Sequence, residues 1–225
     1  MLHVKDRDLV MPGHFIGDGI NICENCFKEG DRVYSSIQGM VRVEKNRVKV
    51  IPSTGTYLPK RMDVIIGVVA EVTRGGWIVD INSPSFCRMG GEEVTENALN
   101  GDLAKYFDVG DTLSAKISSV DEVNSCRIIR PWKLIGGVII EINPKRIPRV
   151  VGRKRSMLEI LKKKTGCNIV VGQNGRIWLK GEDITFTIKI IKMIEREAQT
   201  KGLTDRVSMF LDENRAREVI KNVEE

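Results

Sequence analysis

The chain has 225 residues, with 36 Lys and Arg against 30 Asp and Glu, a formal net charge of +6 and a hydrophobic fraction of 41%. This apolar content is enough for one large core or two to three small ones, which excludes a disordered protein. No apolar run reaches the roughly 20 residues of a membrane-spanning helix, and residues 1–10 lack the apolar segment of a secretory signal. Because the five cysteines are an odd number, we expect reduced thiols in a cytoplasmic protein rather than a disulfide framework.

Positive charge is concentrated in the second half of the chain. Residues 1–130 hold 16 basic and 18 acidic residues, whereas residues 131–225 hold 20 basic and 12 acidic ones. Residues 145–180 contain 11 basic residues and a single acidic one, Glu159. Clustered like charges repel one another, so this field indicates a polyanionic partner. Nucleic acid is the first candidate, and an acidic protein surface is the alternative.

The first two segments are predicted to be β-structure. Residues 1–58 have glycines between short apolar stretches, and residues 39–51 alternate between apolar and polar, which predicts a hairpin with one solvated face. Residues 59–133 are expected to form a small closed barrel of the OB type, with an irregular or briefly helical insertion at 93–107. The barrel strands are predicted at 63–72, 77–81, 108–120 and 126–129.

The third segment, residues 134–225, is predicted to be a separate α/β domain that ends in a helix. Two helices are expected before the last one, the first from Ser156 to Thr165 and the second from about Asp183 to Thr200. Strands are predicted at 135–142, 167–171 and 176–180, with an Asn-Gly hairpin turn between the last two, and the final helix at 212–223. The fold class is therefore multidomain, β and α/β.

A basic loop precedes the first of these helices. Six of the eleven residues from Lys145 to Arg155 are basic: Lys145, Arg146, Arg149, Arg153, Lys154 and Arg155. Gly152 lets the backbone approach a ligand closely, and the helix N-terminus adds unpaired amide donors. The loop is therefore predicted to bind phosphates of a nucleic-acid backbone, the alternative being an ordinary solvated face.

The segments Ile147–Leu161 and Lys164–Val171 resemble the core of a KH domain, which clamps the nucleotide backbone with a GxxG loop between two helices. Gly152, Arg153 and Lys154 fall on the first three positions of that loop. Arg155 stands where the second glycine belongs, so the resemblance implies binding through charge rather than through the usual clamp.

The middle segment resembles an S1-type RNA-binding domain. The similarity lies in residues 63–69, in Gly75-Gly-Trp-Ile-Val-Asp80 and in residues 109–117. In that family an aromatic residue after the glycine turn stacks on bases, and Trp77 occupies this position; the alternative is a structural tryptophan. Arg74 and Arg88 are candidate phosphate contacts at the same mouth of the barrel.

The order of these segments, followed by Gly172-Gln-Asn-Gly175, resembles the S1/KH cap subunit of the archaeal exosome over essentially the whole chain. This resemblance implies a non-catalytic subunit that binds single-stranded RNA and directs its 3′ end to a ring of RNase PH-like subunits, beside other cap subunits. It also implies that the N-terminal domain docks on the ring and that the Gly172–Gly175 turn mainly shapes its own domain. A free-standing S1/KH regulator of translation or transcription is the alternative.

No enzyme, metal or cofactor is predicted. Cys23 and Cys26 have the spacing of half a zinc site, but no second pair of cysteines follows, so two ordinary thiols are expected. His3 and His14 are the only histidines, and no nucleophile, base or paired carboxylates accompany them in a recognised pattern. A nuclease is therefore the least favoured alternative.

Overall fold

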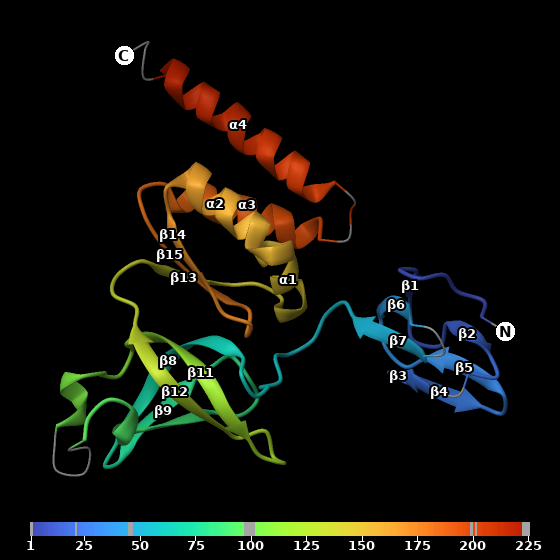
Figure 1. The fold of residues 1–225 in the computed structure, drawn as a ribbon, viewed down its shortest axis with the longest axis horizontal. Coiled ribbons are helices and arrows are strands. Elements are labelled where there is room, and N and C mark those ends of the chain that lie inside the picture. Colours follow the sequence, from blue (N-terminus) through green and yellow to red (C-terminus); the bar gives the residue numbers. More distant parts are fainter. Residues whose placement is uncertain are drawn as a thin grey trace. The chain divides into compact units, whose positions relative to one another are not determined.

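The computed structural model in Figure 1 describes residues 2–20, 22–44, 47–96, 102–198, 200 and 202–221. The chain divides into two compact units, Met1–Gly55 and Thr56–Glu225. The predicted fold class is confirmed, with a β-rich N-terminal part, a closed barrel and a KH-like α/β part with a C-terminal helix. The division into three domains stays a prediction. No candidate membrane-spanning helix occurs among the described residues.

The N-terminal unit contains two small sheets that share one core. The first has the order β1 (Leu9–Val10), β6 (Gly39–Glu44), β7 (Arg47–Pro52) and β3 (Ile22–Glu24), and the second the order β2 (Phe15–Asp18), β5 (Arg32–Ser35) and β4 (Cys26–Glu29). The predicted hairpin is β6–β7, in which Val41 and Val50 are paired and buried while Arg42 and Lys49 are paired and exposed. Its turn at 45–46 lies outside the described residues.

The second unit begins with a barrel of five strands. The strands are β8 (Val64–Thr73), β9 (Gly76–Asp80), β10 (Cys87–Gly90), β11 (Thr112–Val120) and β12 (Cys126–Lys133). The parallel pairing of β10 with β12 closes the barrel around buried apolar side chains. η1 (Gly91–Glu93) ends where the insertion predicted at 93–107 begins, and a second short 3-10 helix, η2 (Leu103–Lys105), lies within it. Residues 97–101 of the insertion lie outside the described residues.

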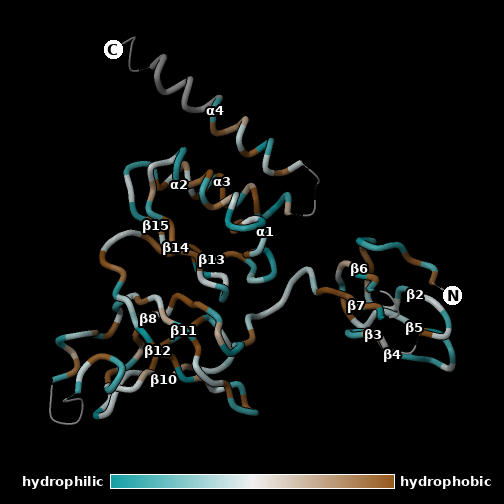
Figure 2. Tube along the Cα trace, in the orientation of Figure 1, coloured by the Kyte–Doolittle hydropathy of each residue, from teal (hydrophilic) through white to brown (hydrophobic). Residues whose placement is uncertain are grey.

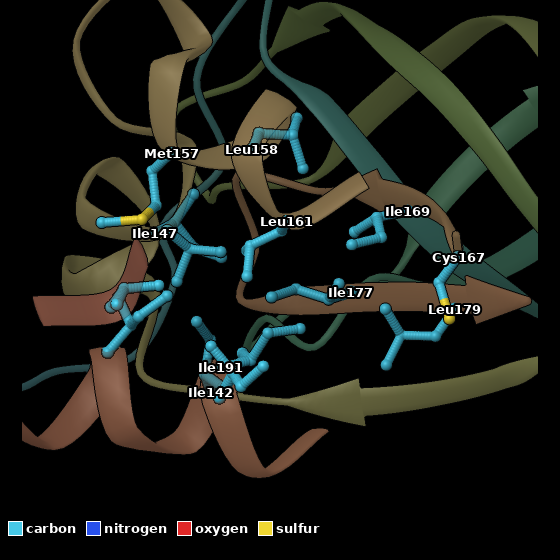
Figure 3. Close-up of a cluster of buried hydrophobic side chains, with 14 of the residues drawn as sticks. Ile142, Ile147, Met157, Leu158, Leu161, Cys167, Ile169, Ile177, Leu179 and Ile191 are labelled. Atoms are coloured by element: carbon cyan, nitrogen blue, oxygen red, sulfur yellow. The ribbon is translucent and has the colours of Figure 1, made fainter. Parts of the chain in front are cut away.

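The α/β part packs helices on one face of a three-stranded sheet. The sheet order is β13 (Val138–Glu141), β15 (Arg176–Lys180) and β14 (Asn168–Val171); the helices are η3 (Pro144–Arg146), α1 (Ile147–Val151), η4 (Arg153–Arg155), α2 (Ser156–Thr165) and α3 (Ile184–Arg196). Figure 3 shows Leu161 and Ile191 of the helices meeting Ile169 and Ile177 of the sheet. Figure 2 shows that hydrophobic residues lie along these strands.

Several predicted boundaries of the α/β part were wrong, among them the end of α3, which lies at Arg196 rather than near Thr200. The strand predicted from residue 135 begins at Val138, because Gly136 and Gly137 both have positive φ. The last helix, α4 (Leu203–Lys221), begins nine residues before the predicted start at residue 212. Its first turns pack Leu203, Val207 and Leu211 on the core cluster, at a spacing of four residues that marks one face of a helix.

A polar turn joins the barrel to the α/β part. Asn174 lies in the turn between β14 and β15 and is fully buried. Its Nδ2 donates to the backbone oxygens of Ile66 and Ile81 at 2.7 and 2.8 Å, and its Oδ1 accepts from the Ile66 N–H at 3.1 Å. Gly175 has a φ of +89°, as an Asn-Gly turn requires. The turn therefore shapes its own domain and also anchors it to the barrel.

Arg176 adds an ionic contact at the same junction. Its guanidinium donates to the Asp80 carboxylate at 2.6 Å, to the Asp80 carbonyl at 2.8 Å and to Glu141 Oε1 at 2.9 Å. Burial raises the pKa of Asp80, but the hydrogen bonds from Arg176 and from the Asn82 N–H lower it more, so this pKa lies below its usual range. Asp80 therefore stabilises the junction as an anion.

The stability of the folded protein at acidic pH should depend on the ion pair between Asp80 and Arg176. Because the pKa of Asp80 is lowered in the folded protein, its stabilising contribution is present above the unfolded pKa of about 3.9 and is lost as the pH falls through the folded value. Asp80→Asn is expected to flatten the loss of stability below about pH 4. Urea unfolding at pH 3 to 7 measures this; an unchanged profile would contradict the assignment. Asp102→Asn, at an exposed carboxylate without an ion pair among the described residues, is the control.

The cysteine prediction requires correction. The structure pairs Cys23 with Cys26 and Cys87 with Cys126 as disulfides, whereas Cys167 is free and buried. Cys87 and Cys126 lie directly opposite each other in the pairing of β10 with β12. They are 39 residues apart in the chain, so their proximity follows from the closure of the barrel and was not predictable from cysteine spacing.

Candidate nucleic-acid interface

The predicted basic loop is accessible and carries free cations. α1 ends at Val151, Gly152 turns the chain, and η4 leads directly into α2. Arg153, Lys154 and Arg155 are all exposed. Among the described residues, none of the six basic side chains of the loop forms an ion pair. These cations are therefore available to an external polyanion.

Arg155, the fourth residue of the turn that begins at Gly152, has a backbone conformation that is typical of glycine. Arg155 has a φ of +66° and Lys154 a φ of +52°, both left-handed, and Gly152 has a φ of +74°. A Cβ at Gly152 would lie 2.6 Å from the Met157 nitrogen, so this position requires glycine. A left-handed residue with a side chain costs roughly 1–2 kcal/mol. The chain thus keeps a strained conformation at Arg155 while placing a cation there.

The variant Arg155→Gly tests the backbone strain and the positive charge at this position by separate measurements. We expect a gain of about 1 kcal/mol in unfolding free energy from the relieved left-handed strain. We also expect the log–log salt slope of RNA binding to become about 0.7 less steep because one cation is lost. Urea unfolding and fluorescence anisotropy measure the two effects. Arg153→Gly is the control, since it removes the same charge at a residue without positive φ and should not stabilise. Equal stability changes for both variants would contradict the explanation.

Trp77 is not a stacking residue, and this prediction was wrong. Its side chain is 1% exposed, lies edge-on to Phe107 and donates from Nε1 to the Phe107 carbonyl at 2.8 Å. Within β9 the side chains of Trp77 and Val79 point into the barrel, so no face of the indole can receive a base. The alternating pattern of this short strand was compatible with either orientation.

Two arginines stand side by side on the outside of the barrel instead. Arg88 of β10 is directly opposite Arg127 of β12, and both are exposed because their neighbours Cys87, Met89 and Ile128 point inward. Like charges placed directly opposite each other are destabilising, and neither arginine has an ion pair among the described residues. Such a pair is suited to holding a phosphate between two guanidinium groups.

A shallow cavity of about 440 Å³ includes both arginines. It is also lined by residues on either side of the glycine turn, including Thr73, Gly75 and Ile78. Arg74 is exposed in that turn, between the lining residues Thr73 and Gly75, but does not itself line the cavity. Phe86, two residues before Arg88, is 58% exposed but does not line this cavity. Sequence reasoning named Arg74 and Arg88 but missed Arg127, since only strand pairing brings Arg127 to Arg88.

Not every cation of the charged segment is free. Arg176 is engaged with Asp80 and Glu141, and Lys164 forms an ion pair with Asp212 at 2.7 Å. Lys180 donates from Nζ to the Ile135 carbonyl. The count over residues 145–180 therefore overstates the charge that an RNA would meet.

Comparisons with known proteins identify relatives of this chain. Family models match residues 7–53, as the N-terminal domain of exosome RNA-binding protein RRP4, and residues 137–185, as a KH domain. Exosome complex component Rrp4 of Methanothermus fervidus is 44% identical to this chain, and the match covers 94% of this chain and 98% of that protein. Exosome complex component Rrp4 of Pyrococcus horikoshii is 38% identical, and the match covers 93% of this chain and 84% of that protein. A crystal structure of a candidate exosome complex RNA-binding protein has a TM-score of 0.65 and 36% identity, covering 73% of this chain and 99% of that one.

Proposed function

The chain belongs to the Rrp4 family of exosome complex components, and on that premise we propose that it is an RNA-binding cap subunit without catalytic activity of its own. In this proposal it binds single-stranded RNA in the cytoplasm and directs the 3′ end to a ring of RNase PH-like subunits, beside other cap subunits. The relatives do not favour the alternative of a free-standing S1/KH regulator.

The proposal is carried by one observation: the second unit has two separate groups of basic side chains that form no ion pairs among the described residues. The basic loop of the α/β part and the barrel pair Arg88 and Arg127 are exposed and without ion pairs among the described residues. Asn174 and Arg176 fix the parts that bear them to each other. A single strand that reaches both groups would gain phosphate contacts without base-specific hydrogen bonds. Binding should therefore depend strongly on salt and weakly on sequence.

Three measurements on the purified chain test this function. Fluorescence anisotropy with oligoadenylate and oligouridylate of equal length should give similar affinities and, for three to four loop contacts, a log–log salt slope of roughly −2 to −3 from the loop. The RNA should stay intact in the presence of phosphate and Mg²⁺. The chain should form a stable complex with the RNase PH-like subunits of its organism. RNA degradation by the chain alone, or a chain that stays monomeric with the ring subunits, would refute the proposal.

A further inference from the structure

The cavity on the outside of the barrel is hollowed where two glycines are paired. Gly76 of β9 lies directly opposite Gly90 of β10, and neither fills the space above the sheet with a side chain. Their neighbours Trp77 and Met89 point into the barrel and are buried, so the two glycines belong to its outer face. The next outward residue of β10 is Arg88, which also lines the cavity. The resulting space of about 440 Å³ has the size that a single nucleotide requires.

One end of this cavity is cationic. Arg88 and Arg127 are directly opposite each other and exposed, and neither forms an ion pair among the described residues. An internal phosphodiester carries one negative charge and would leave one of the two guanidinium groups uncompensated. A terminal phosphate carries a charge of about −1.5 to −2 at pH 7. Charge matching therefore favours a terminal phosphate over an internal one at this pair.

The other end of the cavity carries a carboxylate. Glu92 lines the cavity, is exposed and forms no ion pair in the part of the chain that the structure describes. Its side chain lies over Gly90, because a Cβ added there would collide with the Glu92 carboxylate oxygens. Gly90 is two residues from Arg88 in β10, which is roughly 7 Å of strand. A carboxylate repels phosphate but accepts hydrogen bonds from hydroxyl groups, so this end suits a ribose.

The side of the cavity gives apolar contact rather than base recognition. Ile78 of β9 pairs with Arg88, is half-buried and lines the cavity. The Thr73 hydroxyl, also in the lining, already donates to the Gly76 carbonyl at 2.9 Å. A base placed here would pack on an aliphatic side chain that makes no hydrogen bonds. The arrangement therefore distinguishes the phosphate and the sugar of a nucleotide but not its base.

We propose that this cavity is a binding site for a 5′-phosphorylated ribonucleotide, in which Arg88 and Arg127 hold the phosphate and Glu92 accepts hydrogen bonds from the ribose hydroxyls. A free ribonucleotide and the phosphorylated 5′ end of an RNA both present these groups. The inference rests on the proposed function in one respect, since the 5′ end of an RNA reaches this site only if the chain binds RNA.

The first test compares two oligoadenylates that carry a fluorophore at the 3′ end and either a phosphate or a hydroxyl group at the 5′ end. Anisotropy with the purified full-length chain should give about fivefold tighter binding of the 5′-phosphorylated RNA. Arg88→Gln combined with Arg127→Gln should remove this difference. Lys60→Gln combined with Arg61→Gln is the matched control, because these exposed cations of the same unit lie outside the cavity. The control should keep the full difference.

The second test uses free ligands as competitors for the 5′-phosphorylated RNA. Adenosine 5′-monophosphate should displace it at lower concentration than inorganic phosphate, adenosine or 2′-deoxyadenosine 5′-monophosphate do. Glu92→Gln should reduce the preference for the ribose over the deoxyribose while keeping the effect of the 5′-phosphate. Glu122→Gln, at an exposed carboxylate outside the cavity, is its control and should change neither.

The outcomes separate this inference from the proposed function. A 5′-phosphate effect that is lost only in the arginine variant supports the site, and displacement by the free monophosphate shows that it also takes a free ribonucleotide. Equal binding of the two RNAs by the wild-type chain overturns the inference and leaves the proposed function intact. Equal competition by inorganic phosphate and the monophosphate also overturns it, because the ribose would then contribute nothing. If the wild-type chain binds neither RNA, the proposed function fails, and calorimetry with the monophosphate decides the inference alone: saturable binding supports it and no binding overturns it.

Discussion

Asn174→Ala is expected to destabilise the second unit by about 3–5 kcal/mol, since a lost partner costs about 1–3 kcal/mol for each buried polar group that it leaves unsatisfied. The side chain makes three hydrogen bonds, which satisfy the Ile66 N–H and the carbonyls of Ile66 and Ile81. Urea or thermal unfolding of the purified chain measures the loss.

Two further variants separate hydrogen bonding from packing at this site. Asn174→Asp keeps the shape but turns a carboxylate oxygen toward the two carbonyls, so at neutral pH it should be at least as destabilising as Asn174→Ala. Gln173→Ala is the control: Gln173 is adjacent and exposed, and its side chain contributes one exposed hydrogen bond, to the Val64 N–H. It should cost no more than about 1 kcal/mol. If Asn174→Ala were as mild as this control, the turn would not be what anchors the α/β part to the barrel.

The same turn shows what the sequence could and could not predict. Asn-Gly between two apolar strands predicted the hairpin β14–β15 correctly, because a turn of this type depends on local backbone preference alone. The partners of Asn174 are 108 and 93 residues away in the chain. Which side chain of a turn reaches another part of the protein is decided by tertiary packing, so its role as an anchor between the two parts was invisible in the sequence.

The candidate site likewise has one part that could be predicted from the sequence and one part that could not. The basic loop is a continuous stretch of sequence, and five of the six cations predicted there are exposed, whereas Arg146 is half-buried. The barrel face is assembled from separate strands, so Arg127 could not be assigned to Arg88, and the orientation of Trp77 was predicted wrongly. Charge counting failed for Arg176, because a count does not distinguish a cation used inside the protein from one that is free.

The basic loop should account for a large part of RNA affinity. Combined replacement of Arg153, Lys154 and Arg155 by Ala is expected to make the log–log salt slope about 2 less steep, since each single-strand phosphate contact contributes about 0.7. Extrapolated from 1 M salt, the same three contacts are worth about 100-fold in affinity at 0.1 M salt, so the variant should bind oligoadenylate about 100-fold more weakly there. Anisotropy titrations at several salt concentrations measure both quantities.

A charge-matched control decides whether position or total charge matters. Lys60, Arg61 and Lys105 are exposed on the same unit and form no ion pairs among the described residues. Replacing these three by Ala lowers the net charge by the same amount, so a purely long-range attraction would weaken RNA binding equally in both triple variants. Direct contact at the loop predicts that the control keeps most of its affinity and its full salt slope. A loop variant with wild-type slope would show that the phosphates are held elsewhere, and the barrel pair Arg88 and Arg127 would then have to supply those contacts.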